Sequence, residues 1–216
     1  MNKLKFISLA ALILTFGSLC AQDDAFYSEV RGFMSESRPE YDKIVSSYFA
    51  GQELSADDYA LLYYGYTFTD AYKPDFVNKS VDSLIDAKQY AEAYDALKKE
   101  HLKDPSSLQI LFDLMGLAFV LEKSDEGQQY QKKYINLLLA IVQASGDGLS
   151  RENAIKVNTV RDEFQILSSY FRASSIVKKE FSSSDSIDKV TIKDSEGIVK
   201  DVFFDFTRYV AVTSAQ

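Results

Sequence analysis

The hydrophobic period of this sequence changes at residues 145–157, which read SGDGLSRENAIKV. Before this segment apolar residues recur with the 3.6-residue period of helices, and after it most of them alternate as in strands. Gly146 and Gly148, on either side of Asp147, allow the positive φ that ends a helix, and Ser150 offers an N-cap oxygen to a short turn. The sequence therefore predicts an α+β protein, with a helical region at residues 22–145 and a small α+β region at 146–216 packed on it.

The first residues have the pattern of an export signal. Lys3 and Lys5 precede an apolar run at residues 6–16, and Leu-Cys-Ala-Gln follows at 19–22. The run is too short for a membrane-spanning helix, which needs about 20 residues. We therefore predict a signal peptide at residues 1–21, no membrane span, and export to the periplasm or outer envelope of a Gram-negative bacterium.

Cys20 is the only cysteine, so the cleavage point decides whether a thiol remains. Leu19 stands where a lipoprotein signal has a small residue, which favours cleavage after Ala21. A lipid anchor at Cys20 stays the alternative, because residues 20–24 resemble the acidic tether of surface-exported lipoproteins. Cleavage removes two lysines and takes the formal net charge from −8 to −10. Such a charge repels phosphate backbones, so we predict no nucleic-acid partner.

Two segments of the helical region share a spacing of large residues around a glycine. They are residues 61–68 (LLYYGYTF) and 112–119 (FDLMGLAF), with Gly65 and Gly116 at equivalent places. This pattern resembles the first helix of the tetratricopeptide repeat, in which the glycine lets the neighbouring helix approach closely. The two glycines lie 51 residues apart, whereas the repeat has about 34. The resemblance implies a degenerate repeat, or simply stacked antiparallel helix pairs.

The region after the junction is predicted to form a small antiparallel sheet with one helix. Strand-like runs lie at residues 154–160, 175–181 and 187–193, and a last run with one strongly apolar face begins near residue 202. Residues 161–171 separate the first run from the others and have the period of a helix.

The whole layout is similar to the bacterial family called domain of unknown function 4919. The resemblance is carried by the signal peptide, the helix pairs, residues 62–66 (LYYGY), the junction motif at 145–154 and the terminal FFDF at 203–206. The sequence departs from the family pattern at Arg151, where a proline is expected. The resemblance implies an architecture and a location, and it implies no reaction.

No residue pattern of a known catalytic or metal site is present in the sequence. His101 is the only histidine and lies among charged residues, so we expect a solvated helix end. Asp147 and Glu152 are too few for a calcium loop, which favours a structural turn. We therefore predict no cofactor, no metal and no catalytic set. Paired carboxylates about 5–10 Å apart, brought together by folding, would be the remaining route to an enzyme.

Tyrosines recur on and just after the predicted helix at residues 59–68, which is apolar on two sides. Tyrosine is common in binding surfaces because its ring gives contact area and its hydroxyl gives a hydrogen bond. We therefore name Tyr59, Tyr63, Tyr66 and Tyr72 as candidate ligand-binding residues; the alternative is that they are core rings. The leading interpretation is an exported, non-enzymatic binding or scaffold module for a peptide, protein or glycan. The alternative is an envelope hydrolase that uses paired carboxylates.

Overall fold

The computed structural model describes residues 25–74 and 79–214. The predicted signal peptide at 1–21, Cys20 included, lies outside the described residues. Within them, no helix is both long and apolar enough to cross a bilayer.

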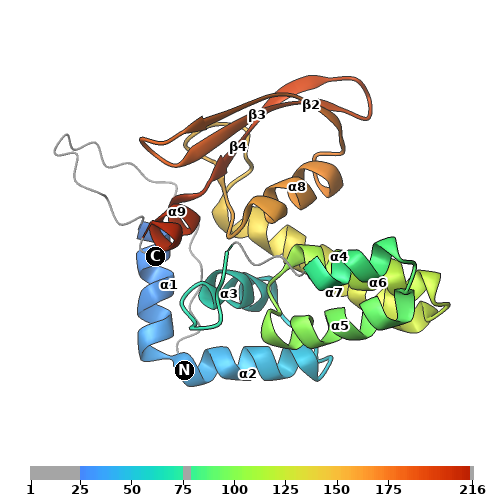
Figure 1. Ribbon diagram of the computed structural model, residues 1–216. Coiled ribbons are helices and arrows are strands. Elements are labelled where there is room, and N and C mark those ends of the chain that lie inside the picture. The colour runs from blue at the N-terminus through green and yellow to red at the C-terminus, as the bar shows by residue number, and fades with distance from the viewer. Residues whose placement is uncertain (1–24, 75–78, 215–216) are drawn as a thin grey trace.

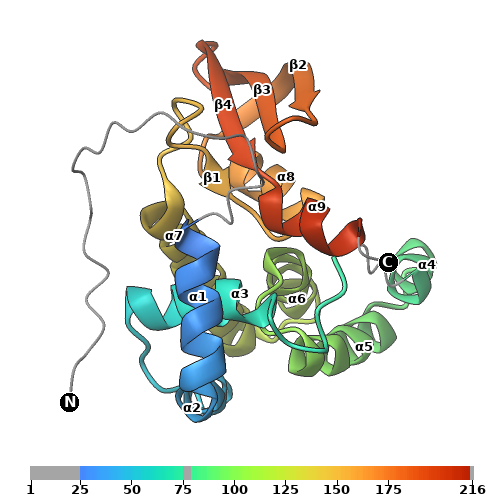
Figure 2. The same ribbon diagram turned by 90° about the vertical axis from the view of Figure 1, so that its left-hand side faces the viewer.

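A run of helices precedes the sheet, as the 3.6-residue period predicts (Figures 1 and 2). Their bounds are α1 (Ala25–Glu36), α2 (Arg38–Phe49), α3 (Ala56–Tyr66), α4 (Lys79–Asp86), α5 (Tyr90–Lys103), α6 (Leu108–Val120) and α7 (Ser124–Ser145). Helix α3 begins with a capping box, in which the Asp58 amide donates to Ser55 Oγ (3.1 Å) and the Ser55 amide donates to Asp58 Oδ2 (3.0 Å). Successive helices pack on one another within α1 to α3 and within α4 to α7, and α7 also packs on α3.

The sheet lies on the other side of α7 from the first helices (Figure 1). Its strands are β1 (Ile155–Lys156), β2 (Ala173–Ser182), β3 (Ile187–Asp194) and β4 (Val199–Asp205), in the spatial order β1-β4-β3-β2. Helix α8 (Val160–Ser169) follows β1, and α9 (Thr207–Thr213) follows β4. The α+β class is confirmed. One detail differs from the prediction: β1 runs parallel to β4, because the chain crosses through α8, β2 and β3 before it returns beside β1.

The junction motif forms a closed turn between α7 and the sheet. Gly146 has a φ of 154° and Gly148 a φ of 71°. The Gly148 amide donates to Asn153 O (2.8 Å), and Gly148 O accepts from the amide of Phe203 in β4 (2.9 Å). Asp147 Oδ1 accepts from the Leu149 amide (2.9 Å), and Ser150 Oγ accepts from the Asn153 amide (3.3 Å). The turn therefore satisfies its own polar groups and pins the end of α7 to the middle of the sheet.

One hydrophobic core runs through both halves of the molecule. Tyr64 of α3 and Ile141 of α7 belong to the same buried cluster as Ile155 of β1 and Phe204 of β4. A smaller cluster lies between α4, α5 and α6, around Tyr94. The change of architecture at the junction is therefore not a break in the core.

The two glycines of the repeat-like segments have different surroundings. A Cβ on Gly65 would lie 2.8 Å from Cε2 of Tyr41 and 3.0 Å from Sδ of Met34, so this glycine allows α3 to approach α1 and α2. A Cβ on Gly116 would meet nothing within 4 Å. The close helix approach that the repeat pattern implies therefore occurs at the first segment and not at the second.

This difference predicts opposite effects for the same substitution. Gly65→Ala should lower the free energy of unfolding by about 1–3 kcal/mol, because the added methyl overlaps the buried Tyr41 ring. Gly116→Ala should raise it by about 0.5–1 kcal/mol, because alanine is the better helix former where space is open. Urea unfolding of both variants beside the wild type measures the two changes. Equal effects at the two positions would contradict the packing described here.

Candidate ligand-binding site

The four candidate tyrosines are buried. Tyr63 donates to Asp162 Oδ2 (2.9 Å), Tyr66 to Ala71 O (3.1 Å) and Tyr72 to Asn158 O (2.6 Å). They form no exposed stripe, and their hydroxyls bind within the chain, as the core alternative expects. Contact with a ligand stays a prediction for them. Tyr59 and Tyr66 each border a cleft.

Asp162, at the start of α8, is the buried carboxylate that accepts a hydrogen bond from Tyr63. Its Oδ2 accepts from the hydroxyls of Tyr63 (2.9 Å) and Thr159 (2.8 Å). Burial raises the pKa of Asp162 to about 7, although both hydroxyls favour the charged form. The Tyr63 hydroxyl also accepts from the Asn158 amide (2.8 Å). This network joins α3 to the segment between β1 and α8, and its role is structural.

A groove of about 550 Å³ lies between the α2–α3 turn and α7. Gly51, with a φ of 69°, reverses the chain after α2 and so forms one wall. The other wall is one face of α7, on which Gln129, Lys132, Lys133 and Asn136 recur at the spacing of a helix surface. Rings border the groove as well, namely Tyr48, Phe49 and Tyr59. The volume is within the range of about 300–1,000 Å³ that is usual for ligand pockets.

Lys133 is the central charge of this α2–α7 groove. Its Nζ lies 4.1 Å from the ring centroid of Tyr48 and 6.0 Å from that of Phe49. Burial lowers the pKa of Lys133. It forms no ion pair within residues 25–74 and 79–214. Its neighbour Lys132 forms only a long and exposed pair with Glu53, 3.9 Å. The groove is therefore bordered by two lysines and by one carboxylate, Glu53, which pairs with Lys132 and not with Lys133.

His101 lies behind this groove and is not the solvated residue that we expected. It is 4% exposed, whereas the adjacent Leu102 is 65% exposed. Its Nε2 lies 3.1 Å from the Tyr48 hydroxyl, and rings of Phe49 and Tyr130 surround it. Burial, together with the charge of Lys133, lowers the pKa of His101 to about 3. A neutral imidazole therefore positions Tyr48 against Lys133.

Carboxylates gather in a different place, in two adjoining clefts of about 70 and 310 Å³ between α5, α6 and the chain after α3. Burial raises the pKa of Asp104 and of Asp113 there. Three of the carboxylates there have local partners: Asp104 accepts from Ser106, Asp113 from Gln109, and Glu100 from Lys103. Asp70 and Asp82 also border the clefts. In the described residues no three His, Cys, Asp or Glu side chains are arranged to hold a metal ion.

Sequence reasoning missed the residues of the α2–α7 groove other than Tyr59. The polar spacing of residues 129, 132, 133 and 136 was visible beside the apolar stripe of the same helix. What the sequence did not show is that the α2–α3 turn faces this side of α7.

Comparisons with known proteins place the whole arrangement in one family. A family model described as "Domain of unknown function (DUF4919)" matches residues 30–214, which include both halves of the fold and the groove. No curated protein and no solved structure matches the chain.

The buried Asp162 predicts a pH effect on stability. Its pKa rises from 3.8 to about 7 on folding, so the stability that it contributes is present below pH 3.8 and is lost as the pH rises toward 7. Asp162→Asn has no such loss. Its free energy of unfolding relative to the wild type should therefore rise by on the order of a few kcal/mol over this window.

Urea unfolding at a series of pH values measures the difference. The control is Asp201→Asn, which should show no such rise, because Lys189 lowers the pKa of Asp201. A difference between Asp162→Asn and the wild type that stays constant with pH would show that Asp162 is not the buried acid described.

Proposed function

The chain belongs to the DUF4919 family, and we propose that it is an exported, non-enzymatic binding protein that holds an acidic glycan in the α2–α7 groove. The observation that carries the proposal is Lys133, a half-buried ammonium against two aromatic rings, which forms no ion pair in the part of the chain that the structure describes.

An anion is the group that this position lacks. Burying a charge without a counter-charge costs free energy, and a charge-assisted hydrogen bond offsets part of that cost. The aromatic rings stabilise the ammonium but accept no conventional hydrogen bond from it. A carboxylate of the ligand would supply both the counter-charge and the acceptor, with Lys132 as a second cation at the rim.

The remaining polar groups of the groove favour a sugar. Gln52, Gln129 and Asn136 border it, and each amide donates and accepts hydrogen bonds. Sugar hydroxyls likewise donate and accept, so amides suit them better than a single charge would. The volume of about 550 Å³ and the open wall suit one or two residues of a chain that continues into solvent. A uronic acid residue combines these features with the required carboxylate.

The helical scaffold is consistent with this role by analogy. Stacked helix pairs of the tetratricopeptide type present grooves to ligands. In this chain α1 to α3 pack as successive neighbours, and so do α4 to α7. The alternative function is an envelope hydrolase. Glu100, Asp104 and Asp113 border shared clefts, but their hydrogen bonds to Lys103, Ser106 and Gln109 give each a structural role.

Lys133→Met tests the binding proposal directly. The variant should bind a galacturonate oligosaccharide roughly ten- to hundredfold more weakly in isothermal titration calorimetry, because a hydrogen bond to a charged group contributes about 1.5–3 kcal/mol. Its melting temperature should stay equal or rise, since the substitution removes a partly desolvated charge. The matched control is Lys43→Met, on the exposed side of α2, which should bind as the wild type does.

The same titration has outcomes that overturn the proposal. Unchanged binding by Lys133→Met would remove its central residue, and equal binding of a neutral galactose oligomer would remove the charge argument. Binding of an acidic peptide in place of the glycan would show that the ligand class is wrong. New reducing ends during incubation would favour the hydrolase.

Export predicts a defined mature N-terminus. Intact-mass measurement of the protein from its native envelope should show an unlipidated chain that begins at Gln22, because Leu19 disfavours lipoprotein processing at Cys20. A mass that includes a diacylglycerol group on Cys20 would contradict this prediction and place the protein on a membrane.

A further inference from the structure

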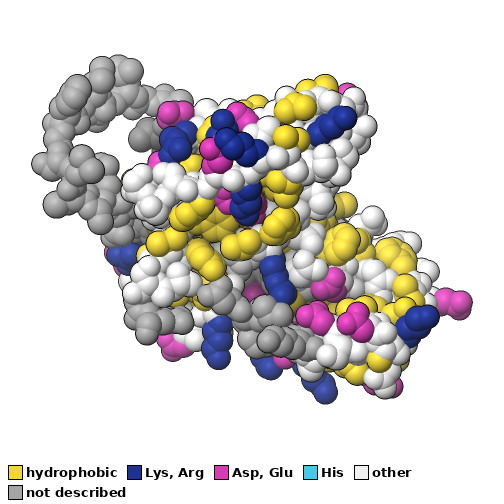
Figure 3. All heavy atoms as spheres, turned by 45° about the horizontal axis from the view of Figure 1, so that its top comes forward, with side chains coloured by type: hydrophobic (Ala, Val, Ile, Leu, Met, Phe, Trp, Pro, Cys, Tyr) yellow, Lys and Arg dark blue, Asp and Glu magenta, His cyan; other side chains and the backbone are white. Residues whose placement is uncertain are grey.

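A second groove, of about 260 Å³, lies beneath the sheet where β2, β3 and α9 meet. Figure 3 shows hydrophobic side chains gathered in the hollow below the sheet, with charged side chains among them. The lining is apolar except at one position: it consists of Val160, Phe181, Asp188, Phe206, Tyr209 and Val210. We call this the sub-sheet groove. It is separate from the α2–α7 groove, so nothing below depends on the glycan proposal.

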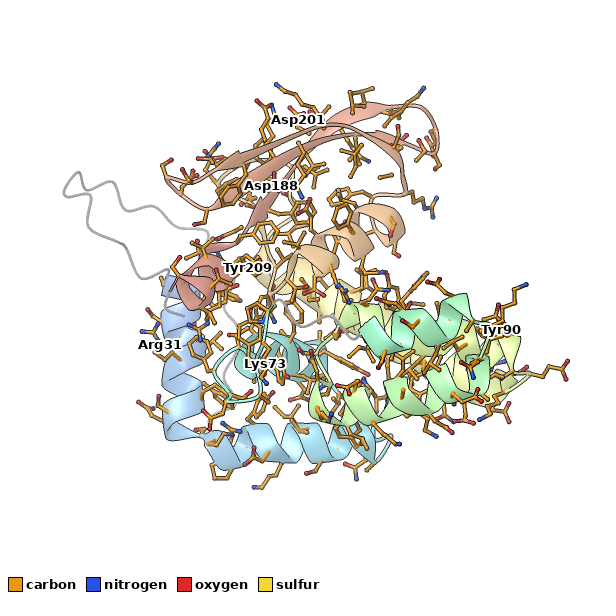
Figure 4. All side chains as sticks on the ribbon, viewed as in Figure 1. Arg31, Lys73, Tyr90, Asp188, Asp201 and Tyr209 are labelled. Atoms are coloured by element: carbon orange, nitrogen blue, oxygen red, sulfur yellow. The ribbon has the colours of Figure 1, made fainter. Side chains whose placement is uncertain are left out.

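Asp188 of β3 is the acid in this apolar lining. Its side chain is 4% exposed, and its Oδ2 accepts from Lys179 Nζ at 3.1 Å. Its Oδ1 is buried and has no hydrogen-bond partner in the part of the chain that the structure describes. Figure 4 shows Asp188 on the side of the sheet that faces the helices and Asp201 on the opposite side. Asp188 therefore lies on the groove side of the sheet, and it is the one carboxylate in the groove lining that the structure describes.

A second carboxylate shares the same lysine. Glu163 of α8 has a fully buried side chain, and its Oε2 accepts from Lys179 Nζ at 2.9 Å. Its Oε1, like Oδ1 of Asp188, has no partner among the described residues. Burial raises the pKa of Glu163 to about 7, and the charge of Asp188 adds to the effect. One ammonium thus stands between two acids, and two buried carboxylate oxygens are left without donors.

The cluster has a structural role that explains only part of it. β2 is an edge strand, and an inward-pointing charge such as Lys179 discourages pairing with the edge of another molecule. That role requires the lysine and one acid. It accounts neither for the second acid nor for the two free oxygens, and it does not account for the apolar hollow beside Asp188.

We propose that the sub-sheet groove is a second binding site for a small hydrophobic amine, whose ammonium donates to Oδ1 of Asp188 while its apolar part lies against Phe181, Phe206 and Val210. An unpaired buried acceptor is costly, and a cationic donor satisfies it with a strong, charge-assisted hydrogen bond. The ammonium also compensates the second acid of the cluster. The groove volume of about 260 Å³ suits a single ring or short alkyl chain.

The probe for the experiment is 2-phenylethylamine, titrated into the full mature chain and followed by NMR. It should bind saturably, and 2-phenylethanol, which has the same ring and spacer without the charge, should bind at least about tenfold more weakly. Asp188→Asn keeps the shape of the side chain and should lower the affinity for the amine by at least about tenfold. Asp201→Asn, on the outer face of the neighbouring strand, is the matched control and should leave the affinity unchanged.

A second variant tests the groove in case Asp188→Asn does not fold. Val160→Phe fills the groove from the first turn of α8 and leaves Asp188 in place, so it should abolish binding while the melting temperature stays near that of the wild type. Lack of binding by the wild type, equal affinity for amine and alcohol, or unchanged affinity in Asp188→Asn overturns the proposal. If Asp188→Asn does not fold, amine binding retained by Val160→Phe overturns it.

Discussion

The structure depends on the buried hydroxyls of two adjacent tyrosines in α3. Tyr63 accepts from the Asn158 amide and donates to Asp162. The Tyr64 hydroxyl lies 3.1 Å from the carbonyl oxygens of both Ile141 and Lys156, which share its one hydrogen. A buried backbone group without a partner costs about 1–3 kcal/mol. The Lys156 carbonyl and the Asn158 amide lie where the chain leaves β1, and the two tyrosine hydroxyls bond to them there. The tyrosines thereby hold the sheet against the helices at one orientation.

That orientation makes α7 the common support of the molecule. One face of α7 packs on α3 and α6, its C-terminus enters the glycine turn, and its exposed face forms a wall of the α2–α7 groove. The turn then connects to β4 through the bond between Phe203 and Gly148. A change in the junction would therefore alter the position of the sheet. Lys133, near the middle of α7, is held instead by its contacts with the Tyr48 and Phe49 rings.

The two proposed sites have opposite electrostatics for a shared physical reason. Each has a charged group that folding removed from water without giving it a full complement: an ammonium on rings at Lys133, and carboxylate oxygens at Asp188 and Glu163. Such groups weaken the folded state unless something compensates them. The chain is acidic, with a formal net charge of −8, so most of its surface repels anions. An anionic ligand would therefore bind at Lys133 more selectively than a cationic ligand would bind at Asp188.

The sequence by itself determined the features that depend on neighbouring residues. Periodicity predicted the helices and the class, and the Gly146 to Gly148 turn predicted the junction, because φ restrictions and capping act within a few residues. Tertiary structure alone decided the parallel pairing of β1, the burial of His101 in place of Leu102, and the open space at Gly116. It also decided both grooves, since Lys133 and Asp188 gain their character from what folding places beside them. Those contacts join residues far apart in the chain, and local patterns do not encode which surfaces meet.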